Sequence, residues 1–337
     1  MDRRRFLKDA STTLGAAVFA PSLLRAIELD QAPSTTARVA FVKTTDRAAG
    51  VARAIDLLGV ERLRGKDLFV KPNLNSADVA PGSTHEDTLV ALLRKLKAMG
   101  SGPLTVGDRS GMGNTREVMG KKSVFQLGKE LDAKVVVFDE LGPDDWETIK
   151  PADSHWQQGF ALPKVVRKAG GIVQTCCLKT HRYGGHFTLS LKNSVGLAAK
   201  FVPGNPYNFM QELHSSPHQR HMIAEINAAY HPDLIVLDGV EAFVNGGPDR
   251  GKLVQANVIL AGTDRVAVDA VGVALLRHFG TTPDVTQGAI FDQEQIARAA
   301  QLKVGVAGPK QIELVTGDRD SADYAKLVRM VLDGGSA

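Results

Sequence analysis

The stretch GIVQTCCLKTHRYGGHFTLSLKNSVG, which runs from Gly171 to Gly196, passes from mostly small and apolar residues into a dense group of polar ones. Its first part, residues 171–178, has the length and composition of a buried β-strand. Lys179, Thr180 and His181 follow at once, where that strand should end. In open α/β sheets, ligands bind outside the carboxyl ends of the strands. The stretch therefore predicts a strand of a central sheet and, directly after it, the wall of a polar site.

Apolar runs and helical patterns alternate along the rest of the chain. The expected strands are 38–43, 67–71, 104–106, 134–138, 171–178, 234–237, 257–261 and 311–315. The expected helices are 46–58, 84–99, 124–131, 163–168, 217–230, 264–279 and 322–332. This order predicts an α/β fold with a mainly parallel, Rossmann-like sheet and helices on both faces. Residues 193–216 have no clear period, which is typical of a functional lid or a disordered segment.

The N-terminal residues have the pattern of an export signal. A basic cluster, Arg3-Arg4-Arg5, precedes a mildly apolar run at 10–24 and the small residue Ala26. The segment Arg3-Arg4-Arg5-Phe6-Leu7-Lys8 resembles the twin-arginine signal, which directs folded proteins to export. We therefore expect a signal peptide at 1–26, a linker at 27–37, a single large α/β domain at 38–335 and a periplasmic or otherwise exported protein. An amphipathic N-terminal helix and an uncleaved anchor are the alternatives.

Charge and cysteine content exclude several partners and cofactors. The chain has 337 residues and a net charge of +4, and residues 1–26 hold five Lys or Arg and two Asp, so about +1 remains after cleavage. We expect no nucleic-acid partner, no stable membrane span after cleavage, and the twin-arginine translocase as a partner during export. The two cysteines, Cys176 and Cys177, are too few for an iron–sulfur cluster, so none is expected.

Polar residues follow four of the predicted strands. Lys71 ends the second strand and Asn73 follows it. Asp108 and Ser110 follow the third strand, Lys179 and His181 the strand at 171–178, and Asp238 the strand at 234–237. Ammonium groups beside carboxylates and glycine-flanked amides suit an anionic substrate such as a carboxylate or a phosphate. We predict one site in which Lys179, His181, Asp108, Asp238 and Lys71 are catalytic. The alternative is an ion-pair network that joins the sheet to its loops.

A second pattern lies on the helix that follows Ser216 and Pro217. His218, His221 and Glu225 stand at positions i, i+3 and i+7, on one helical face. Imidazole and carboxylate at this spacing can bind a divalent metal such as zinc, nickel or iron. The alternative is a solvated polar face. Asp269 lies inside an apolar helical run, and an unpaired buried carboxylate is costly, so we expect it to meet Lys179, Lys192 or a backbone donor.

Five segments carry a resemblance to a known family. FVKPNLN, VGDRSGMGN, CCLKTHRYGGHFTLSLKNSVG, LIVLDGVEAFVNGGP and AGTDRVAVDAVG follow one another in the order seen in the family of domain of unknown function 362. The resemblance covers about residues 67–275. Some members carry added iron–sulfur modules, whose cysteines this chain lacks. The resemblance implies site candidates at Lys71, Asn73, Asp108, Lys179, His181, Lys192, Asn193, Asp238 and Asp269. Of these, Asn73, Lys192, Asn193 and Asp269, together with Ser110, are predicted to bind substrate.

Three functional hypotheses follow. The first is an exported enzyme of unestablished reaction, with a Lys/Asp/His pocket for an anionic substrate or cofactor and with or without the assistance of a metal. One version is similar to lactate-racemase-type nickel enzymes, which join a lysine-linked cofactor to histidines. The second is an exported protein that binds a small anionic solute or cofactor without turnover. The third is an accessory protein of a redox complex, which predicts a large exposed apolar patch.

Overall fold

The structure is a computed structural model that describes residues 36–335. The predicted signal peptide at 1–26 and nearly all of the predicted linker at 27–37 lie outside the described residues.

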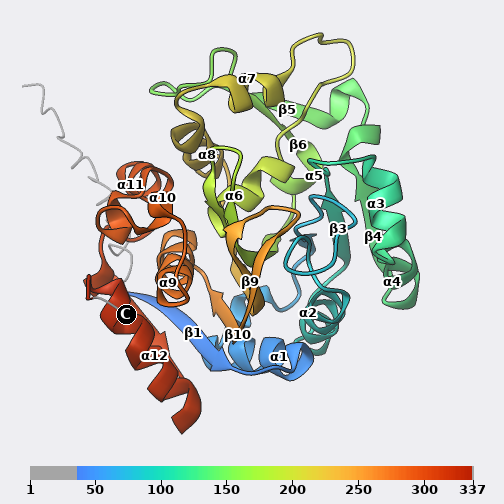
Figure 1. The fold of residues 1–337 in the computed structure, drawn as a ribbon. Helices are drawn as coiled ribbons and strands as arrows, with labels where there is room; N and C mark the ends of the chain where they lie inside the picture. Colours follow the sequence, from blue (N-terminus) through green and yellow to red (C-terminus); the bar gives the residue numbers. More distant parts are fainter. Residues whose placement is uncertain (1–35, 336–337) are drawn as a thin grey trace, which may run out of the picture. The chain divides into compact units, whose positions relative to one another are not determined.

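A mixed but mostly parallel sheet forms the centre, as predicted (Figure 1). Its strand order is β11-β1-β10-β9-β7-β2-β3-β4, with β8 added to β7. The strands are β1 Ala37–Lys43, β2 Leu68–Lys71, β3 Leu104–Asp108, β4 Ala133–Val137, β7 Gly171–His181, β8 His186–Thr188, β9 Leu234–Gly246, β10 Gly251–Gly262 and β11 Ile312–Val315. All neighbours are parallel except at β10, which is antiparallel to β1 and β9, and at β8, which is antiparallel to β7.

Helices cover both faces of this sheet, because alternate strand residues supply two separate cores. Ala40 and Val42 of β1 belong to the core beneath four helices, α1 Arg47–Leu58, α2 Glu86–Ala98, α3 Thr115–Lys121 and α4 Val124–Glu130. Val39 and Phe41 belong to the opposite core, beneath α9 Arg265–His278, α11 Glu294–Gln301 and α12 Arg319–Leu332.

A third core extends the second face over the β2, β3 and β4 side of the sheet. It packs Phe69 and Phe138 against α7 Phe209–Ser215, α8 Gln219–Asn227 and a small hairpin, β5 Trp146–Ile149 with β6 Phe160–Pro163. The remaining helices are short: α5 Lys164–Arg167, α6 Ser190–Asn193 and α10 Pro283–Thr286. None of the helices between residues 36 and 335 is long and apolar enough to cross a membrane.

Several stretches differ from their prediction, among them β10, which was predicted at 257–261 and begins at Gly251, and the hairpin of β5 and β6, α3 and α11, which were not predicted. The strand predicted at 234–237 continues to Gly246 and pairs with β10 in a long two-stranded arm. Residues 193–216, which showed no period, contain the end of α6, a 3-10 turn at Ser194–Gly196 and α7. The helix predicted from residue 217 begins at Gln219, with His218 at its N-cap position. Cys176 and Cys177 are free and buried.

Candidate functional site

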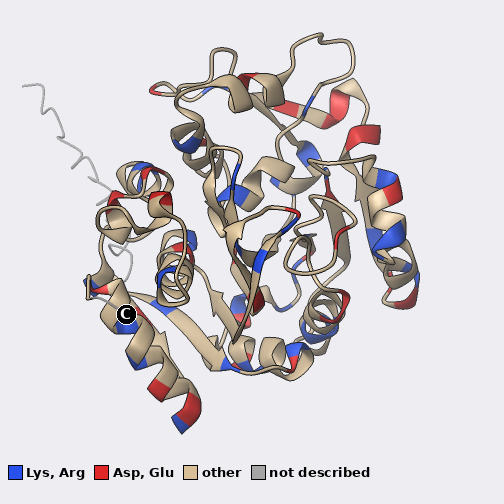
Figure 2. Ribbon diagram, viewed as in Figure 1, with Lys and Arg blue, Asp and Glu red and all other residues tan. Residues whose placement is uncertain are grey.

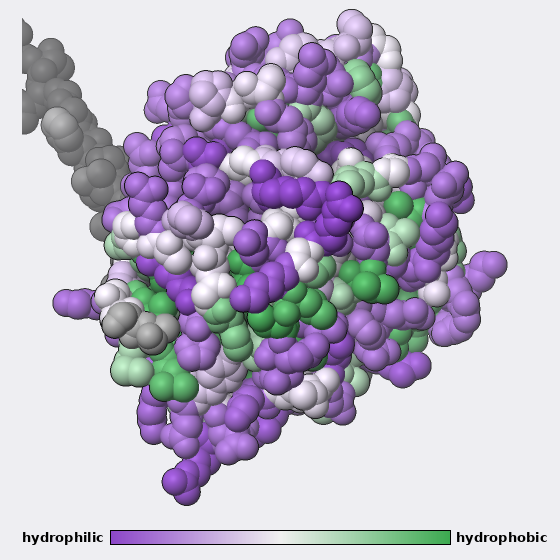
Figure 3. Space-filling view, viewed as in Figure 1, coloured by the Kyte–Doolittle hydropathy of each residue, from purple (hydrophilic) through white to green (hydrophobic). Residues whose placement is uncertain are grey.

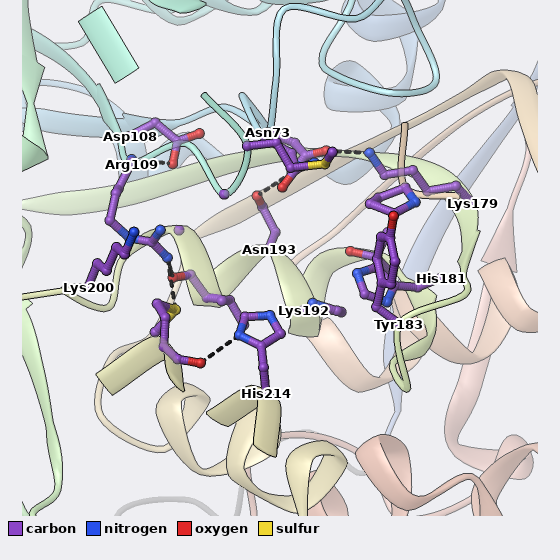
Figure 4. Close-up of a pocket in the computed structure, with 18 of the residues that line it drawn as sticks. Asn73, Asp108, Arg109, Lys179, His181, Tyr183, Lys192, Asn193, Lys200 and His214 are labelled. Carbon is purple, nitrogen blue, oxygen red and sulfur yellow. Dashed lines mark hydrogen bonds between the residues drawn. The ribbon is translucent and has the colours of Figure 1, made fainter. Parts of the chain in front are cut away.

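A pocket of about 490 Å³ lies at the carboxyl ends of β2, β3 and β7 (Figure 4). Segments far apart in the sequence meet there, because the parallel strands end at one edge of the sheet. Seven residues predicted from the sequence line it: Lys71, Asn73, Asp108, Lys179, His181, Lys192 and Asn193. The other wall comes from residues 195–214, which lie within the segment 193–216 that was predicted to be a lid or disordered.

Lys71 and Asp108 form a buried ion pair at the base of the pocket. The Lys71 Nζ lies 2.7 Å from Asp108 Oδ1, and each side chain is 1 % exposed. Asp108 also accepts hydrogen bonds from the amides of Leu74 and Arg109, at 2.8 and 2.7 Å. Burial lowers the pKa of Lys71 and raises that of Asp108, and the attraction between the two opposes both shifts. The pair is thus held in place and its charges largely cancel.

Lys179 is anchored by uncharged oxygens. Its Nζ donates to Asn73 Oδ1 at 2.8 Å and to the Gly82 carbonyl at 2.5 Å. Asn193 connects the two lysines, since its Oδ1 accepts from Lys71 at 3.1 Å and from Asn73 at 3.4 Å. Burial lowers the pKa of Lys179. Among residues 36–335, the ammonium of Lys179, unlike that of Lys71, has no carboxylate within ion-pair distance.

Lys192 has the least engaged ammonium of the pocket. It is 7 % exposed, and its ammonium makes no hydrogen bond or ion pair with the described residues. Burial, followed by the charges of Lys179 and Arg109, lowers the pKa of Lys192 to about 8. A buried ammonium without a counter-ion is costly, and a bound anion would remove that cost.

His181 lies beside Lys192. A Cβ added at Gly185 would stand 2.7 Å from Lys192 Cε and 2.9 Å from His181 Nδ1, so both side chains converge on this glycine. Burial, followed by the charges of Lys192 and Lys179, holds the pKa of His181 well below its usual range. Its Nδ1 is buried without a hydrogen-bond partner in the described structure. A neutral imidazole that lies beside an ammonium can accept a proton from a ligand held by that ammonium.

Three further basic residues of the pocket, Arg109, Lys200 and His214, were not predicted. Arg109 lines the pocket, and its guanidinium donates to the carbonyls of Ala198 and Val195, both at 2.8 Å. Lys200 stands at the exposed rim, and His214 of α7 holds its Nδ1 2.6 Å from the Met210 carbonyl. Figure 4 shows Arg109 and Lys200 across the open space from Lys179, His181 and Lys192. The five cationic side chains that line the pocket, Lys71, Arg109, Lys179, Lys192 and Lys200, face one carboxylate, Asp108.

Three residues predicted for the site, Asp238, Ser110 and Asp269, lie outside the pocket lining. Asp238 accepts from Arg47 Nε at 2.9 Å and from Thr88 Oγ1 at 2.6 Å, which joins the sheet to α1 and α2. Ser110 is buried and donates to the Leu74 carbonyl at 2.7 Å. Asp238 and Ser110 therefore have protein partners away from the space in which a ligand would lie.

Asp269 also lies outside the pocket lining. It accepts from the amides of Ser190 and Leu191 at 2.8 and 3.0 Å and from Ser190 Oγ at 2.5 Å, so it meets backbone donors, one of the expected alternatives. Burial raises the pKa of Asp269 to about 7, opposed by these donors. Its contacts hold the start of α6, the helix that carries Lys192 and Asn193.

The residues predicted to bind a metal lie apart from the pocket. His218 and His221 form a cluster with His155, in which one possible ligand atom from each residue lies within 4.8 Å of the others. His155 was not predicted, because its loop between β5 and β6 has no periodic pattern. Glu225 lies beside this cluster, where it pairs with Arg298 Nη2 at 3.0 Å and with His155 Nδ1 at 2.6 Å.

Comparison with known protein families gives a match to the family described as domain of unknown function (DUF362), over residues 68–274. These residues contain the whole lining of the pocket. A thylakoid-associated protein of Synechocystis sp. is 26% identical over 256 residues, which cover 74% of this chain and 74% of that protein.

Among solved structures, the lactate racemase apoprotein from Thermoanaerobacterium thermosaccharolyticum is similar with a TM-score of 0.45 and 17% identity. The matched region covers 72% of this chain and 57% of the racemase chain, so this chain spans little more than half the length of that protein. A similarity this distant is uninformative about activity.

Proposed function

The chain belongs to the DUF362 family, whose description assigns no activity, and from its own pocket we propose that it binds a small anionic substrate and transfers a proton to or from it. The observation that carries the proposal is the charge of the pocket lining, five cationic side chains against one carboxylate. An anion such as a carboxylate or a phosphate is the ligand that this excess favours.

In this proposal, Lys192 and His181 have different tasks. Lys192 holds the anion as an ammonium, since no other side chain of the described residues neutralises it. His181 is neutral at pH 7 and accepts or returns the proton. Lys179 adds positive charge, and the Lys71–Asp108 pair holds Asn193 in the pocket wall.

One observation favours the alternative of a binding protein without turnover. Asp238, predicted as a second proton-transfer carboxylate, is paired with Arg47 away from the pocket. Asp108 is the one carboxylate in the lining, and Lys71 holds it at 2.7 Å. If His181 does not transfer protons, the cationic side chains of the lining still bind an anion.

Calorimetric titration tests the binding part of the proposal. Inorganic phosphate, succinate and the neutral control glycerol are each titrated into the protein, and at least one anion should bind at one equivalent. Lys192→Met should weaken that binding at least about tenfold, since a charge-assisted contact is lost. Lys129→Met, which removes an exposed charge on α4, should leave it unchanged. Binding of no anion, or equal binding by both variants, would overturn the proposal.

Proton transfer is tested separately. Wild-type protein and His181→Gln are incubated in D₂O with the carboxylate that binds, and deuterium incorporation at its carbon atoms is followed by NMR. Exchange catalysed by the wild type and lost in a variant that still binds supports the enzyme. Binding by both without exchange in either supports the alternative, a protein that binds without turnover.

We propose a different location for a divalent metal. Zinc, nickel or iron would lie at the histidine cluster, whose residues do not line the pocket, so anion binding does not depend on the metal.

The accessory-protein hypothesis has weaker support. Figure 3 shows hydrophobic residues among hydrophilic ones on the face in view, and the large exposed hydrophobic side chains of the described residues belong to separate segments, such as Val79, Phe201 and Met330.

Export rests on the N-terminal sequence alone, and we propose that the protein is periplasmic or otherwise exported through the twin-arginine pathway. The motif Arg3-Arg4-Arg5-Phe6-Leu7-Lys8 supports this proposal. The double substitution Arg3→Lys and Arg4→Lys keeps the charge but removes the guanidinium groups, so a guanidinium-specific translocase should leave the chain inside the cell. Cell fractionation measures the outcome, and Lys8→Arg is the control. Equal export of the double variant would contradict the pathway.

A further inference from the structure

A group of three imidazole rings lies outside the pocket. His155 comes from the loop between β5 and β6, His218 stands at the N-cap position of α8, and His221 lies in its first turn. The ring centroid of His155 lies 4.5 Å from that of His218 and 5.2 Å from that of His221. The centroids of His218 and His221 are 6.0 Å apart. One possible ligand atom from each residue lies within 4.8 Å of the others.

Glu225 orients His155 within this group. A carboxylate oxygen can only accept a hydrogen bond, so the 2.6 Å contact between Glu225 Oε1 and His155 Nδ1 places the ring proton on Nδ1. The Nε2 of His155 is then left with a free lone pair. Histidine ligands of metals are commonly held in this way, with the second ring nitrogen donating to a carboxylate.

The other oxygen of Glu225 fixes the loop itself. Glu225 Oε2 accepts from the His155 amide at 2.9 Å and from Ser154 Oγ at 3.0 Å. With Oε1 also bound to Arg298, both oxygens are already engaged. Glu225, predicted from the sequence as a ligand, is therefore placed behind the ligands as a positioning residue.

His221 supplies an independent observation. Its Nδ1 is buried and has no hydrogen-bond partner among the described residues. An unsatisfied buried polar atom costs about 1–3 kcal/mol, so such atoms are uncommon in native proteins. A metal ion bound to this nitrogen, and shared with His155 and His218, would give it the partner that it lacks.

We infer that His155, His218 and His221 bind one divalent transition-metal ion, zinc or nickel, through one imidazole nitrogen each. Three neutral imidazoles suit these metals and not magnesium, which prefers oxygen ligands. Metal–nitrogen bonds of about 2.0–2.1 Å require the ligand atoms to be closer than they stand here, and the exposed His218 has the freedom to rotate inward. Three protein ligands leave at least one coordination position open.

The surroundings do not oppose a cation. The two nearby arginines are each paired with a glutamate, Arg298 with Glu225 at 3.0 Å and Arg220 with Glu294. A bound ion would join the loop of His155 to the first turn of α8. The segment that precedes this turn is α7, whose Met210, Gln211 and His214 line the pocket. The metal would therefore lie one helix away from the wall of the anion pocket, and anion binding does not depend on it.

Metal titration tests the inference on untagged protein stripped with a chelator. ZnCl₂, NiCl₂ and MgCl₂ are titrated by calorimetry, each alone. We expect one equivalent of zinc or nickel to bind, no magnesium to bind, and the melting temperature to rise with the bound metal. His155→Ala and His218→Ala should each weaken binding at least about tenfold, and Glu225→Gln about tenfold. His278→Ala, which lies on α9, should bind as the wild type does.

Two controls separate a lost site from a lost fold. Glu225→Gln also breaks the pair with Arg298, so its fold is checked by circular dichroism, whereas the exposed His218 can be replaced without that complication. Lys192→Met should lose anion binding and retain the metal, and metal-free protein should retain anion binding. The inference is overturned if the stripped wild type takes up neither zinc nor nickel, or if His155→Ala and His218→Ala bind as tightly as the wild type.

Discussion

Lys192 controls the charge of the pocket at physiological pH. Its pKa of about 8 lies below that of a free lysine, so the free pocket loses a positive charge as the pH rises through 8. An anion binds the protonated form more tightly, so affinity should be highest below pH 8 and fall above it, by up to about tenfold per pH unit. Sulfate is a suitable probe, since it does not titrate in this range, and its dissociation constant is measured from pH 6.5 to 9.5.

The matched variant for this prediction is Lys192→Arg. A guanidinium stays charged throughout the range, so the decline above pH 8 should disappear even if the affinity itself is lower. His181 has its pKa well below the range and contributes no step there. A wild-type affinity that is constant with pH would contradict the role given to Lys192.

Gly196 allows the 3-10 turn to approach the buried ion pair. A Cβ at this position would lie 2.5 Å from Asp108 Oδ1 and 2.7 Å from Lys71 Nζ, closer than real Cβ atoms come. Gly196→Ala should therefore lower the free energy of unfolding by about 1–3 kcal/mol, through overpacking, and weaken anion binding. Gly120→Ala is the control, because that helical glycine has nothing within 4 Å of an added Cβ. Chemical denaturation measures both, and equal stability of the two variants would show that the pair can shift at little cost.

The sequence predicts some site residues better than others. Lys71, Asp108 and Lys179 follow apolar runs directly, so the rule for strand ends finds them. The same rule selects Asp108 and passes over Arg109, the residue next to it. Arg109 is held in the pocket wall by hydrogen bonds to the carbonyls of Ala198 and Val195, which the sequence does not reveal. His155 has no local pattern, because the partner that orients it, Glu225, lies 70 residues away along the chain.

At the scale of elements, α6 depends on a contact with α9. It has only four residues, too few for a stable isolated helix, and Asp269 of α9 accepts the amides of Ser190 and Leu191. Asp269→Ala would leave those buried donors unpaired and should cost about 3 kcal/mol of unfolding free energy. It should also weaken sulfate binding, because Lys192 follows two residues after Ser190.

The control for this prediction is Asp46→Ala, which removes an exposed helix cap on α1. It should cost about 1 kcal/mol and leave sulfate binding unchanged. Both variants are titrated at a temperature where each is folded. Full affinity in a destabilised Asp269→Ala would mean that α6 keeps its position without the carboxylate.

The sequence predicts most of the sheet but not the arm or the short elements. Apolar runs bounded by turn residues predict β1, β2, β4 and β11 to within one residue at either end. The strand β9 continues past its prediction because Asp238, Glu241 and Asn245 interrupt the apolar pattern while the backbone keeps its ladder with β10. The helix α7 was missed because seven residues hold too little periodicity to be recognised.

At the scale of the molecule, positive charge is concentrated in the pocket. Without residues 1–26, which carry +3, the +4 of the chain becomes +1. The pocket lining carries five positive charges and one negative, a net +4, so the remaining residues carry −3. Figure 2 shows both signs distributed over the helices, which suits a surface without a single dominant sign. The local excess, and not the net charge, should therefore attract the anion.

Asp238 tests whether a buried residue outside the pocket lining affects the stability of the fold but not the binding of the anion. It was predicted as a catalytic residue, yet it ties β9 to Arg47 of α1 and Thr88 of α2 and is 3 % exposed. Asp238→Asn removes the charge with little change of shape, and Arg47 retains Glu241 as a partner at 2.8 Å. The free energy of unfolding should fall by about 2 kcal/mol, less than for a fully broken buried pair.

Sulfate affinity of Asp238→Asn at pH 7 should stay within about twofold of the wild type, because no contact to the pocket is lost. Glu140→Gln, which removes an exposed pair with Arg116, should change neither quantity measurably. Denaturation and calorimetry on the same preparations separate the two effects. A loss of affinity as large as that of Lys192→Met, in a protein that is still folded, would mean that Asp238 acts on the ligand and that the pocket extends toward α1.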